Sequence, residues 1–467
     1  MDAALRPFEE KMRAAQMPEP AVQTFRHYYA LLAQGTTGII REKDIEPLTD
    51  DDLTTYEHAA AFKDAGIEAM DEVVAVKLNG GLGTSMGLDG PKCMLEARGG
   101  MTFLDTTIRQ MQSGHTLSGR AIPLVLMNSF NTEAQSLALL EKYEDPSCGL
   151  PHSFLQHRFP KVLRDGLGPA TWPANPTLEW NPPGHGDLYA AMYTSDILAR
   201  LQKAGKRYAF VSNIDNLAAV LDPVLLGYFV SRRLPFMMEV VRRTPMHRKG
   251  GHLARLRAGG RLVLREIAQA AAEDLDSFQD VVRHRWFNTN NLWVDLERLA
   301  TMMEEAKGVV KLPLIRNHKH LDPRDSSSPE VYQIETAMGA AVSLFDGAEA
   351  IAVPNERYAP VKKSVDLLVL RSDRFQMSDD FVLSPAPATT DTISVRLDER
   401  YYGKYDDLEA RFPSGPPSLK NCEEFVVEGD VVFGKKTRVE GRATVHNTQT
   451  VRAAIDDGMV LTGKVTL

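Results

Sequence analysis

The sequence predicts an α/β protein in which helices cover a central sheet. From Glu72 onward, short runs rich in β-branched residues alternate with longer amphipathic segments, a pattern typical of strands separated by helices. A chain of 467 residues is long enough for two or three domains with substantial cores. Its composition, 43% hydrophobic and 25% charged, is that of a globular protein and excludes disorder or a fibrous repeat.

The chain divides into three predicted parts. Residues 1–70 predict an N-terminal helical segment, with helices over 21–32 and 56–69 and turns around Gly35 and Pro47. Residues 71–375 predict the main domain, with strands over 73–77, 122–127, 208–212, 236–241, 291–294 and 350–353. Several of these strands end in polar clusters, and in open α/β sheets ligands gather at the carboxyl ends of the strands.

Residues 376–467 predict a smaller C-terminal β domain. The helical signal fades after about residue 373, and past Asn421 short apolar pairs are broken by glycine and charge, as in residues 431–441. Recurrent small coils of this kind are typical of a parallel β-helix. An antiparallel meander fits the composition equally well, so the residues leave both arrangements open.

Charge and cysteine content exclude several classes of protein. With a net charge of −8, the chain lacks the excess of basic residues that is typical of a general nucleic-acid-binding protein. An anionic ligand must therefore be held by local positive groups. Cys93, Cys148 and Cys422 are too few and too scattered for a disulfide framework or a zinc module, which favours a reducing cytoplasm. No stretch approaches the roughly 18 apolar residues of a membrane span, and the charged residues Glu9 and Lys11 argue against a cleaved leader.

The most informative segment is a glycine-rich turn that directly follows the first predicted strand. It runs K-L-N-G-G-L-G-T-S-M-G over residues 77–87. Glycines permit unusual backbone torsions and close approaches, and successive backbone amides in such a turn form a concavity that binds anions. The turn is therefore a candidate site for a nucleoside triphosphate, with a purely structural turn as the alternative.

Two better-known phosphate loops do not match this segment. A dinucleotide fingerprint requires a third glycine where Met86 stands. A Walker A loop requires a glycine where Ser85 stands, and here Pro91 precedes Lys92 and Cys93 follows it. Neither an oxidoreductase nor a P-loop ATPase is indicated.

Residues 77–92, KLNGGLGTSMGLDGPK, closely resemble the signature of UTP–glucose-1-phosphate uridylyltransferases. Six further blocks resemble the same family in the same order: LMNSFNT at 126–132, PPGHGD at 182–187, NIDNL at 213–217, NTNNLW at 288–293, QIETAMG at 333–339 and PVK at 360–362. The resemblance covers roughly residues 72–370. Seven ordered blocks make coincidence an inadequate explanation.

The resemblance implies a fold and a reaction. The implied fold is a Rossmann-like mixed sheet flanked by helices, of the nucleotide-diphospho-sugar transferase type, with a C-terminal left-handed parallel β-helix that in relatives can mediate self-association. The implied reaction is reversible, Mg²⁺-dependent, in-line transfer of the uridylyl group of UTP to α-D-glucose 1-phosphate, giving UDP-glucose and pyrophosphate. The alternatives are a uridylyltransferase for another sugar 1-phosphate, either that of N-acetylglucosamine or a broad range of them, and a catalytically silent UDP-sugar-binding protein.

The same resemblance implies the reacting centre. Transfer between two polyanions requires convergent cations, because two unit charges about 4 Å apart repel by roughly 4 kcal/mol at an effective dielectric near 20. Lys92 follows the glycine turn and Lys362 follows a predicted strand, and matching lysines in the family contact the phosphates. Asp215 lies beyond the strand at 208–212 and is the implied magnesium ligand. The turn residues implied to bind substrate are Leu78, Asn79, Gly80, Gly81, Gly83 and Thr84.

Further residues are implied to recognise the base and the sugar. Gln156 matches a family glutamine that reads uracil, whose donor and acceptor edge an amide complements. Gly184 lets the backbone approach the base, and His185 is implied to donate a hydrogen bond to the sugar or its phosphate. It is not needed as a general base, since the attacking phosphate oxygen is already ionised. Asn213, Glu239 and Asn290, the last with its neighbour Asn291, are implied to hold sugar or ribose hydroxyl groups.

Three features depart from the family pattern. Cys93 stands where a serine is common, and Lys363 doubles the usual single lysine. The segment 244–251, which contains Arg248 and Lys249, differs from the acidic version of eukaryotic relatives. The role of that loop and the redox behaviour of Cys93 are left open by the sequence.

Overall fold

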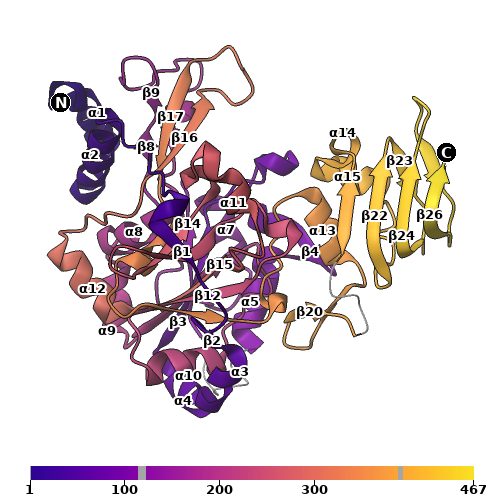
Figure 1. Ribbon diagram of the computed structural model, residues 1–467, viewed down its shortest axis with the longest axis horizontal. Coiled ribbons are helices and arrows are strands. Elements are labelled where there is room, and N and C mark those ends of the chain that lie inside the picture. Colours follow the sequence, from indigo (N-terminus) through magenta and orange to yellow (C-terminus); the bar gives the residue numbers. More distant parts are fainter. Residues whose placement is uncertain (1, 114–121, 388–392) are drawn as a thin grey trace.

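A large sheet with helices on both faces forms the body of the protein, and a smaller β unit lies to one side of it (Figure 1). The computed structural model describes residues 2–113, 122–387 and 393–467. Within these residues, none of the helices is both long enough and apolar enough to cross a lipid bilayer.

The chain begins with a helical hairpin, α1 (Asp2–Ala14) and α2 (Glu19–Ala33). The rings of Phe8, Phe25 and Tyr29 pack together with centroids 5.0 to 6.1 Å apart, and Phe25 also contacts Phe159 of the main body. The hairpin is therefore fixed to the body by its apolar face. The predicted helix over 21–32 corresponds to most of α2.

The rest of the N-terminal part is less regular than the sequence analysis predicts. The single helix expected over 56–69 is divided into α3 (Tyr56–Ala59), a 3₁₀ turn and α4 (Lys63–Glu68). Two short strands were not predicted, β1 (Ile45–Pro47) and β2 (Thr54–Thr55), and both join the main sheet. The helix prediction over this stretch was therefore wrong in detail.

The main sheet runs in the order β2-β18-β12-β15-β11-β3-β6-β7. Its long strands are β3 (Val73–Asn79), β6 (Leu124–Asn128), β7 (Ser153–Leu155), β11 (Tyr208–Asn213), β12 (Phe236–Arg242), β15 (Trp286–Asp295) and β18 (Glu349–Ala352). Only β15 in this order is antiparallel to its neighbours, β11 and β12. The carboxyl ends of the other strands consequently share one edge of the sheet. The mixed sheet is the predicted one.

Strand β3 shows why these segments become central strands. Val73 and Ala75 face one apolar core, while Val74 and Val76 face the other, so both sides of the strand are buried. A continuous β-branched run is what such a strand requires. On the first face lie α5 (Phe103–Ser113), α7 (Glu133–Leu140), α10 (Pro223–Ser231) and α13 (Ser364–Arg371), and on the second lie α8 (Leu188–Thr194), α9 (Ile197–Lys203) and α12 (Leu296–Glu305).

Smaller elements surround the sheet. The hairpin of β13 (His252–Leu256) and β14 (Leu262–Arg265) extends it beside β15. The remaining elements of the body are β4 (Glu96–Arg98), β5 (Met101–Thr102), β8 (Phe159–Pro160), β9 (Val162–Leu163), β10 (Trp180–Asn181), α11 (Leu275–Gln279), β16 (Ile315–His320) and β17 (Glu330–Glu335).

The C-terminal part is built from parallel strands. After β19 (Phe375–Met377) and β20 (Leu383–Pro385), the chain forms β21 (Ser394–Leu397), α14 (Glu399–Tyr402), α15 (Tyr405–Arg411), β22 (Cys422–Glu428), β23 (Val431–Phe433), β24 (Arg438–His446), β25 (Ala453–Ile455) and β26 (Val460–Thr466). The order β21-β22-β24-β26 is parallel throughout, as is the pair β23-β25. This pairing decides against the antiparallel meander that the sequence left open.

A buried histidine pair beside β15 gives a prediction about acid stability. His252 stacks on His284 with ring centroids 3.9 Å apart, and neither ring nitrogen of His252 has a hydrogen-bond partner among the described residues. Burial lowers the pKa of both groups. The unfolded chain therefore binds protons more tightly than the folded one, and the folded state loses stability as the pH falls below about 6.5, by up to ~1.4 kcal/mol per pH unit for each group.

We expect His252→Leu to reduce the amount of folding free energy that is lost as the pH falls. Urea denaturation at pH 7.5 and at pH 5.0 measures the free energy of unfolding, and the difference between the two values is the quantity to compare. His58→Leu, at an exposed position, is the control. An unchanged difference in His252→Leu would contradict the assignment.

Candidate active site

The candidate site lies at the carboxyl edge of the sheet, where the glycine turn leaves β3. The turn closes on itself: the Lys92 amide donates to the Gly81 carbonyl at 3.1 Å, and the Gly83 amide donates to the Gly90 carbonyl at 3.2 Å. Gly81 faces open space, and Thr84 is exposed. Closure of the turn thus brings the Lys92 backbone beside the glycines, although the two are a dozen positions apart.

Gln156 packs directly on this turn. A Cβ atom at Gly80 would lie 2.7 Å from the Gln156 Nε2 atom, so a larger residue there would displace the amide end of Gln156. The Gln156 backbone amide donates to the Asn128 carbonyl at 2.9 Å, which fixes the start of its segment at the end of β6. Beneath the turn, Asn79 is buried and donates from Nδ2 to Asn128 and to Ser136, both at 2.8 Å. The side chain of Asn79 therefore shapes the turn from below.

Three segments that are distant in sequence meet at Asp215. The Lys92 Nζ atom lies 2.6 Å from Asp215 Oδ2. The Val361 backbone amide donates to the Asp215 carbonyl at 3.1 Å, and Asn216 forms a bridge with Pro360. The backbone that leads into Lys362 is consequently held next to the segment that carries Asp215, which in turn is paired with Lys92.

Asp215 also has an oxygen atom available to coordinate a cation. Its Oδ1 atom is buried and has no hydrogen-bond partner among the described residues. In the described part of the chain, Asp215 included, no group of three or more His, Cys, Asp or Glu side chains could hold a metal. Mg²⁺ is commonly bound by one or two carboxylates together with substrate phosphates and water. A single carboxylate with one free oxygen is therefore compatible with this ion.

His185 is arranged as a neutral hydrogen-bond donor. The Met338 backbone N–H donates to His185 Nδ1 at 2.9 Å, so the neutral ring carries its proton on Nε2. Burial, with a smaller contribution from Lys362, lowers the pKa of His185 to about 4. Gly184, at φ +78°, lies so close to Thr336 that a Cβ atom would be 2.4 Å from its carbonyl oxygen. The ring is thus held rigidly and is charged only in acid.

Glu239 lies in a buried ionic network beside the site. It is 0% exposed, and its oxygens accept hydrogen bonds from Arg357 at 2.8 and 2.9 Å, Asn291 at 3.1 Å and Trp293 at 3.0 Å. Its predicted contact with a sugar hydroxyl group stays a prediction, because every one of these bonds is internal. Asn290 has φ +60° and accepts a hydrogen bond from Asn288.

Two buried cationic residues, one in this network and one in β3, were not singled out by the sequence analysis. Arg357 also donates to the Val220 carbonyl at 2.9 Å, and it belongs to the segment that leads to Lys362. Lys77 opens the glycine motif, yet its amine points inward and donates to Ser212 and Ala219. Burial lowers the pKa of Lys77 to about 7. The only sequence signal for either residue was its place inside a recognised block or close to one.

Leu78 and Asn213 lie at the carboxyl ends of neighbouring strands, Leu78 one residue before the end of β3 and Asn213 at the end of β11. They are Cα partners in the parallel pairing of β3 with β11, and both are half-buried. The loop 244–251, whose role was open, lies near Lys362: His247 stacks on Phe287 at 4.5 Å, and its pKa falls to about 4 through burial, Arg243 and Lys362. The loop is thus a further wall on the Lys362 side.

Cys93, next to Lys92, is a poor redox sensor. The thiol is 1% exposed, and burial raises its pKa to about 11. Since the thiolate is the reactive form, a buried thiol with a raised pKa is inert at neutral pH. The substitution of the common serine by cysteine therefore adds a small core residue and no reactive group.

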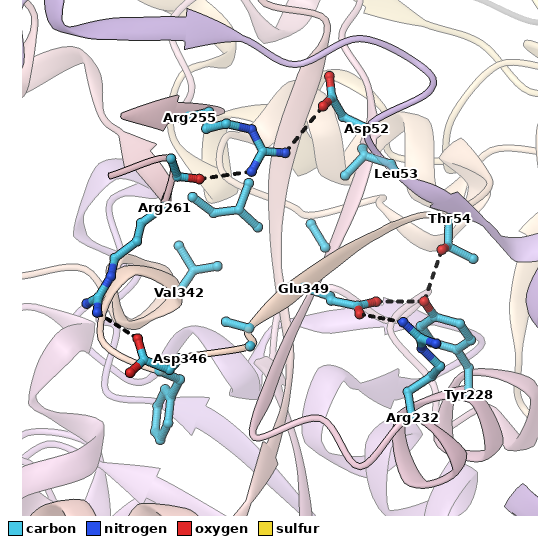
Figure 2. Close-up of a pocket in the computed structure, with 16 residues that line it drawn as sticks. Asp52, Leu53, Thr54, Tyr228, Arg232, Arg255, Arg261, Val342, Asp346 and Glu349 are labelled. Carbon is cyan, nitrogen blue, oxygen red and sulfur yellow. Dashed lines mark hydrogen bonds and ion pairs between the residues drawn. The ribbon is translucent and has the colours of Figure 1, made fainter. Parts of the chain in front are cut away.

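A pocket of about 440 Å³ lies at the opposite edge of the sheet (Figure 2). It includes Glu349, the first residue of β18, so it opens where the strands begin. Each guanidinium group on its rim is already paired: Arg232 with Glu349 at 3.2 Å, Arg255 with Asp52 at 3.3 Å and Arg261 with Asp346 at 2.6 Å. The pocket is separate from the glycine turn and offers no uncompensated positive charge for a triphosphate.

Comparison with known proteins agrees with this geometry. A family model described as UTP–glucose-1-phosphate uridylyltransferase matches residues 22–440. The chain belongs to this family. It is similar to the enzymes of that name from Solanum tuberosum, at 35% identity, and Hordeum vulgare, at 36%; each alignment covers 90% of this chain and 87% of the relative.

Solved structures show the same relationship over the whole chain. A UDP-glucose phosphorylase from Trypanosoma brucei is 42% identical, with a TM-score of 0.91 and complete coverage of both chains. A variant UDP-glucose pyrophosphorylase from Leishmania major, solved in complex with UDP-glucose, is 39% identical with a TM-score of 0.93, again over the full length of both chains. The protein is accordingly a nucleotidyltransferase that forms UDP-glucose and pyrophosphate from UTP and glucose 1-phosphate.

Proposed function

We propose that the carboxyl edge of the sheet is where this reaction takes place. UTP binds with its uracil against Gln156 and Gly184 and with its phosphates along the turn formed by Leu78, Asn79, Gly80, Gly81, Gly83 and Thr84. Glucose 1-phosphate binds on the side of Asn213, Glu239 and Asn290. The proposal is supported chiefly by the meeting of Lys92, Asp215 and the Lys362 segment beside the turn.

The chemistry requires alignment and charge neutralisation. An oxygen of the glucose 1-phosphate attacks the α-phosphorus of UTP in line, the new P–O bond forms, and the bond to the bridging oxygen breaks as pyrophosphate leaves with its electron pair. No proton needs to be removed, since the attacking oxygen is already ionised. Lys92 and Lys362 stabilise the charge that develops on the phosphoryl oxygens. The neutral His185 donates its Nε2–H to a phosphate oxygen.

Asp215 is the proposed ligand for Mg²⁺. When bound, the ion supplies further positive charge at the phosphates. The Oδ1 atom has no hydrogen-bond partner among the described residues, while Oδ2 holds Lys92. The carboxylate thus fixes one catalytic lysine and presents its second oxygen to the ion.

We expect Asp215→Asn to raise the Mg²⁺ concentration needed for half-maximal activity by roughly tenfold, because an amide oxygen is a weaker ligand for this ion than a carboxylate. Pyrophosphate release measured over a magnesium titration, after treatment with a chelator, tests this. Asp346→Asn at the remote pocket is the control. A titration curve identical to that of the unmodified enzyme would remove Asp215 as the metal ligand.

We also propose the domain division and the setting of the protein. Residues 1–70 form an N-terminal helical segment, residues 71–375 form the catalytic domain, and residues 376–467 form a left-handed parallel β-helix. Parallel pairing of successive coils and a separate apolar core around Phe425 and Val439 support the last of these. Three unpaired cysteines agree with a cytoplasmic enzyme. Strand β26, at the end of its sheet order, offers an edge through which the C-terminal domain associates with a second copy.

A further inference from the structure

The end of the glycine turn is covered by a side chain from the C-terminal part of the protein. Gly87 follows the 3₁₀ turn of Thr84–Met86 and has φ +76°. A Cβ atom at Gly87 would lie 3.1 to 3.3 Å from the Cβ, Cγ and Cδ atoms of Lys404. The aliphatic stem of Lys404 therefore crosses the turn in van der Waals contact with its backbone.

The same C-terminal segment also contacts the segment that carries Lys362. Lys363 Nζ lies 2.6 Å from Glu399 Oε1, and Ser364 Oγ donates to the Gly403 carbonyl at 2.6 Å. In Figure 1, α13, α14 and α15 lie together where the β unit joins the body. The stretch Glu399–Lys404 thus adjoins both loops of the proposed site.

Positive charge is scarce along the turn itself. Residues 78–91 contain no lysine or arginine, and Asp89 is their only charged side chain. The Lys77 amine is turned inward to Ser212 and Ala219, and Lys92 is paired with Asp215. Lys404 is exposed and makes no ion pair with any residue in the described ranges. Its amine is thus available at the part of the turn that has no cation of its own.

We propose that Lys404 is a further substrate-binding residue, which contacts the β- and γ-phosphates of UTP and the pyrophosphate that leaves. This rests on the proposed placement of the triphosphate along the turn. Pyrophosphate carries several negative charges at neutral pH, and a lysine ammonium group is a common phosphate ligand. Neither UDP-glucose nor glucose 1-phosphate carries the two phosphates that leave as pyrophosphate. The second phosphate of UDP-glucose comes from glucose 1-phosphate and lies on the opposite side of the α-phosphorus, so Lys404 contacts two of the four reactants, UTP and pyrophosphate.

Lys404→Met tests the charge separately from the packing, because methionine keeps an unbranched apolar stem over Gly87. We expect the KM for pyrophosphate in the reverse reaction, and for UTP in the forward reaction, to rise roughly tenfold, the usual scale for loss of a charge-assisted contact. The KM values for UDP-glucose and glucose 1-phosphate stay within about twofold. Lys404→Arg retains the charge and restores most of the affinity. Lys464→Met, at an exposed lysine of β26, is the matched control.

Three results would overturn the assignment: an unchanged KM for pyrophosphate in Lys404→Met, no restoration by Lys404→Arg, or an equal rise in the KM for UDP-glucose. Lys92→Met distinguishes this failure from a failure of the proposed site. If only Lys404 is misassigned, Lys92→Met still raises the KM for pyrophosphate. If the triphosphate lies elsewhere, neither variant changes it.

Discussion

Replacing Lys362 with methionine is expected to lower kcat by about 10²- to 10³-fold, which is the usual cost of removing one preorganised group that stabilises transition-state charge. Burial is the main cause of the lowered pKa of both His185 and His247, and the positive charge of Lys362 contributes to each, after Arg243 in the case of His247. The Lys362 amine therefore acts on two groups that line the site. The ammonium group is needed most when charge builds up on the phosphoryl oxygens, so kcat falls more than substrate affinity.

The neighbouring lysine offers a matched control. Lys363 is paired with Glu399 on the surface, and the two side chains are 65% and 76% exposed. Exposed pairs of this kind contribute little to stability, about 0 to 1 kcal/mol. We expect Lys363→Met to keep kcat within about threefold of the unmodified enzyme. Release of pyrophosphate by purified variants measures both effects, and near-normal turnover of Lys362→Met would exclude Lys362 from the mechanism.

The largest effect on stability is expected for Arg357→Met. The substitution leaves Glu239 fully buried without its cationic partner, and breaking a buried ion pair from one side typically costs about 3 to 5 kcal/mol. The Arg357 carbonyl also accepts a hydrogen bond from Asn216, which lies beside Asp215. Loss of the guanidinium group is therefore expected to loosen the segment that leads to Lys362 and to lower activity as well.

Urea denaturation measures the change in the free energy of unfolding. The double variant Arg357→Met with Glu239→Gln removes both charges and is expected to recover part of the loss, because no buried charge then lacks a partner. Arg232→Met breaks an exposed pair at the remote pocket and should change stability by less than about 1 kcal/mol. A similar small change for Arg357→Met would show that the buried pair contributes little.

Local pattern predicted the main sheet well. Strands such as β3 and β11 are buried on both faces, so each appears in the sequence as a continuous run of apolar and β-branched residues. Such a run can be recognised without knowing which strands lie beside it. Strands β1 and β2 have three and two residues, too few to show a period, and they exist because β13 and β18 offer them hydrogen bonds. Strand β15 contains the polar stretch 288–291, which interrupts its apolar pattern, so only its second half was predicted.

The helix expected over 56–69 was altered by a neighbour in space. Gly66 of α4 packs against α10 so closely that a Cβ atom would lie 1.8 Å from the Pro223 carbonyl oxygen. Gly227 of α10 makes the same kind of contact with Phe62. A sequence window shows a glycine in a helical pattern, but it does not show the second backbone that requires it.

The sequence by itself determined the long strands of the main sheet and, through seven ordered blocks, the family, and it indicated that the glycine turn binds phosphate. These properties depend on neighbouring residues, whose spacing alone fixes burial and backbone freedom. The tertiary structure decided that Asp215 holds Lys92, that His185 carries its proton on Nε2, that Arg357 neutralises Glu239 and that Lys404 lies over Gly87. Each of these joins segments far apart in the chain, and the strength of a charge or hydrogen-bond contact depends on distance in space, which local sequence does not specify.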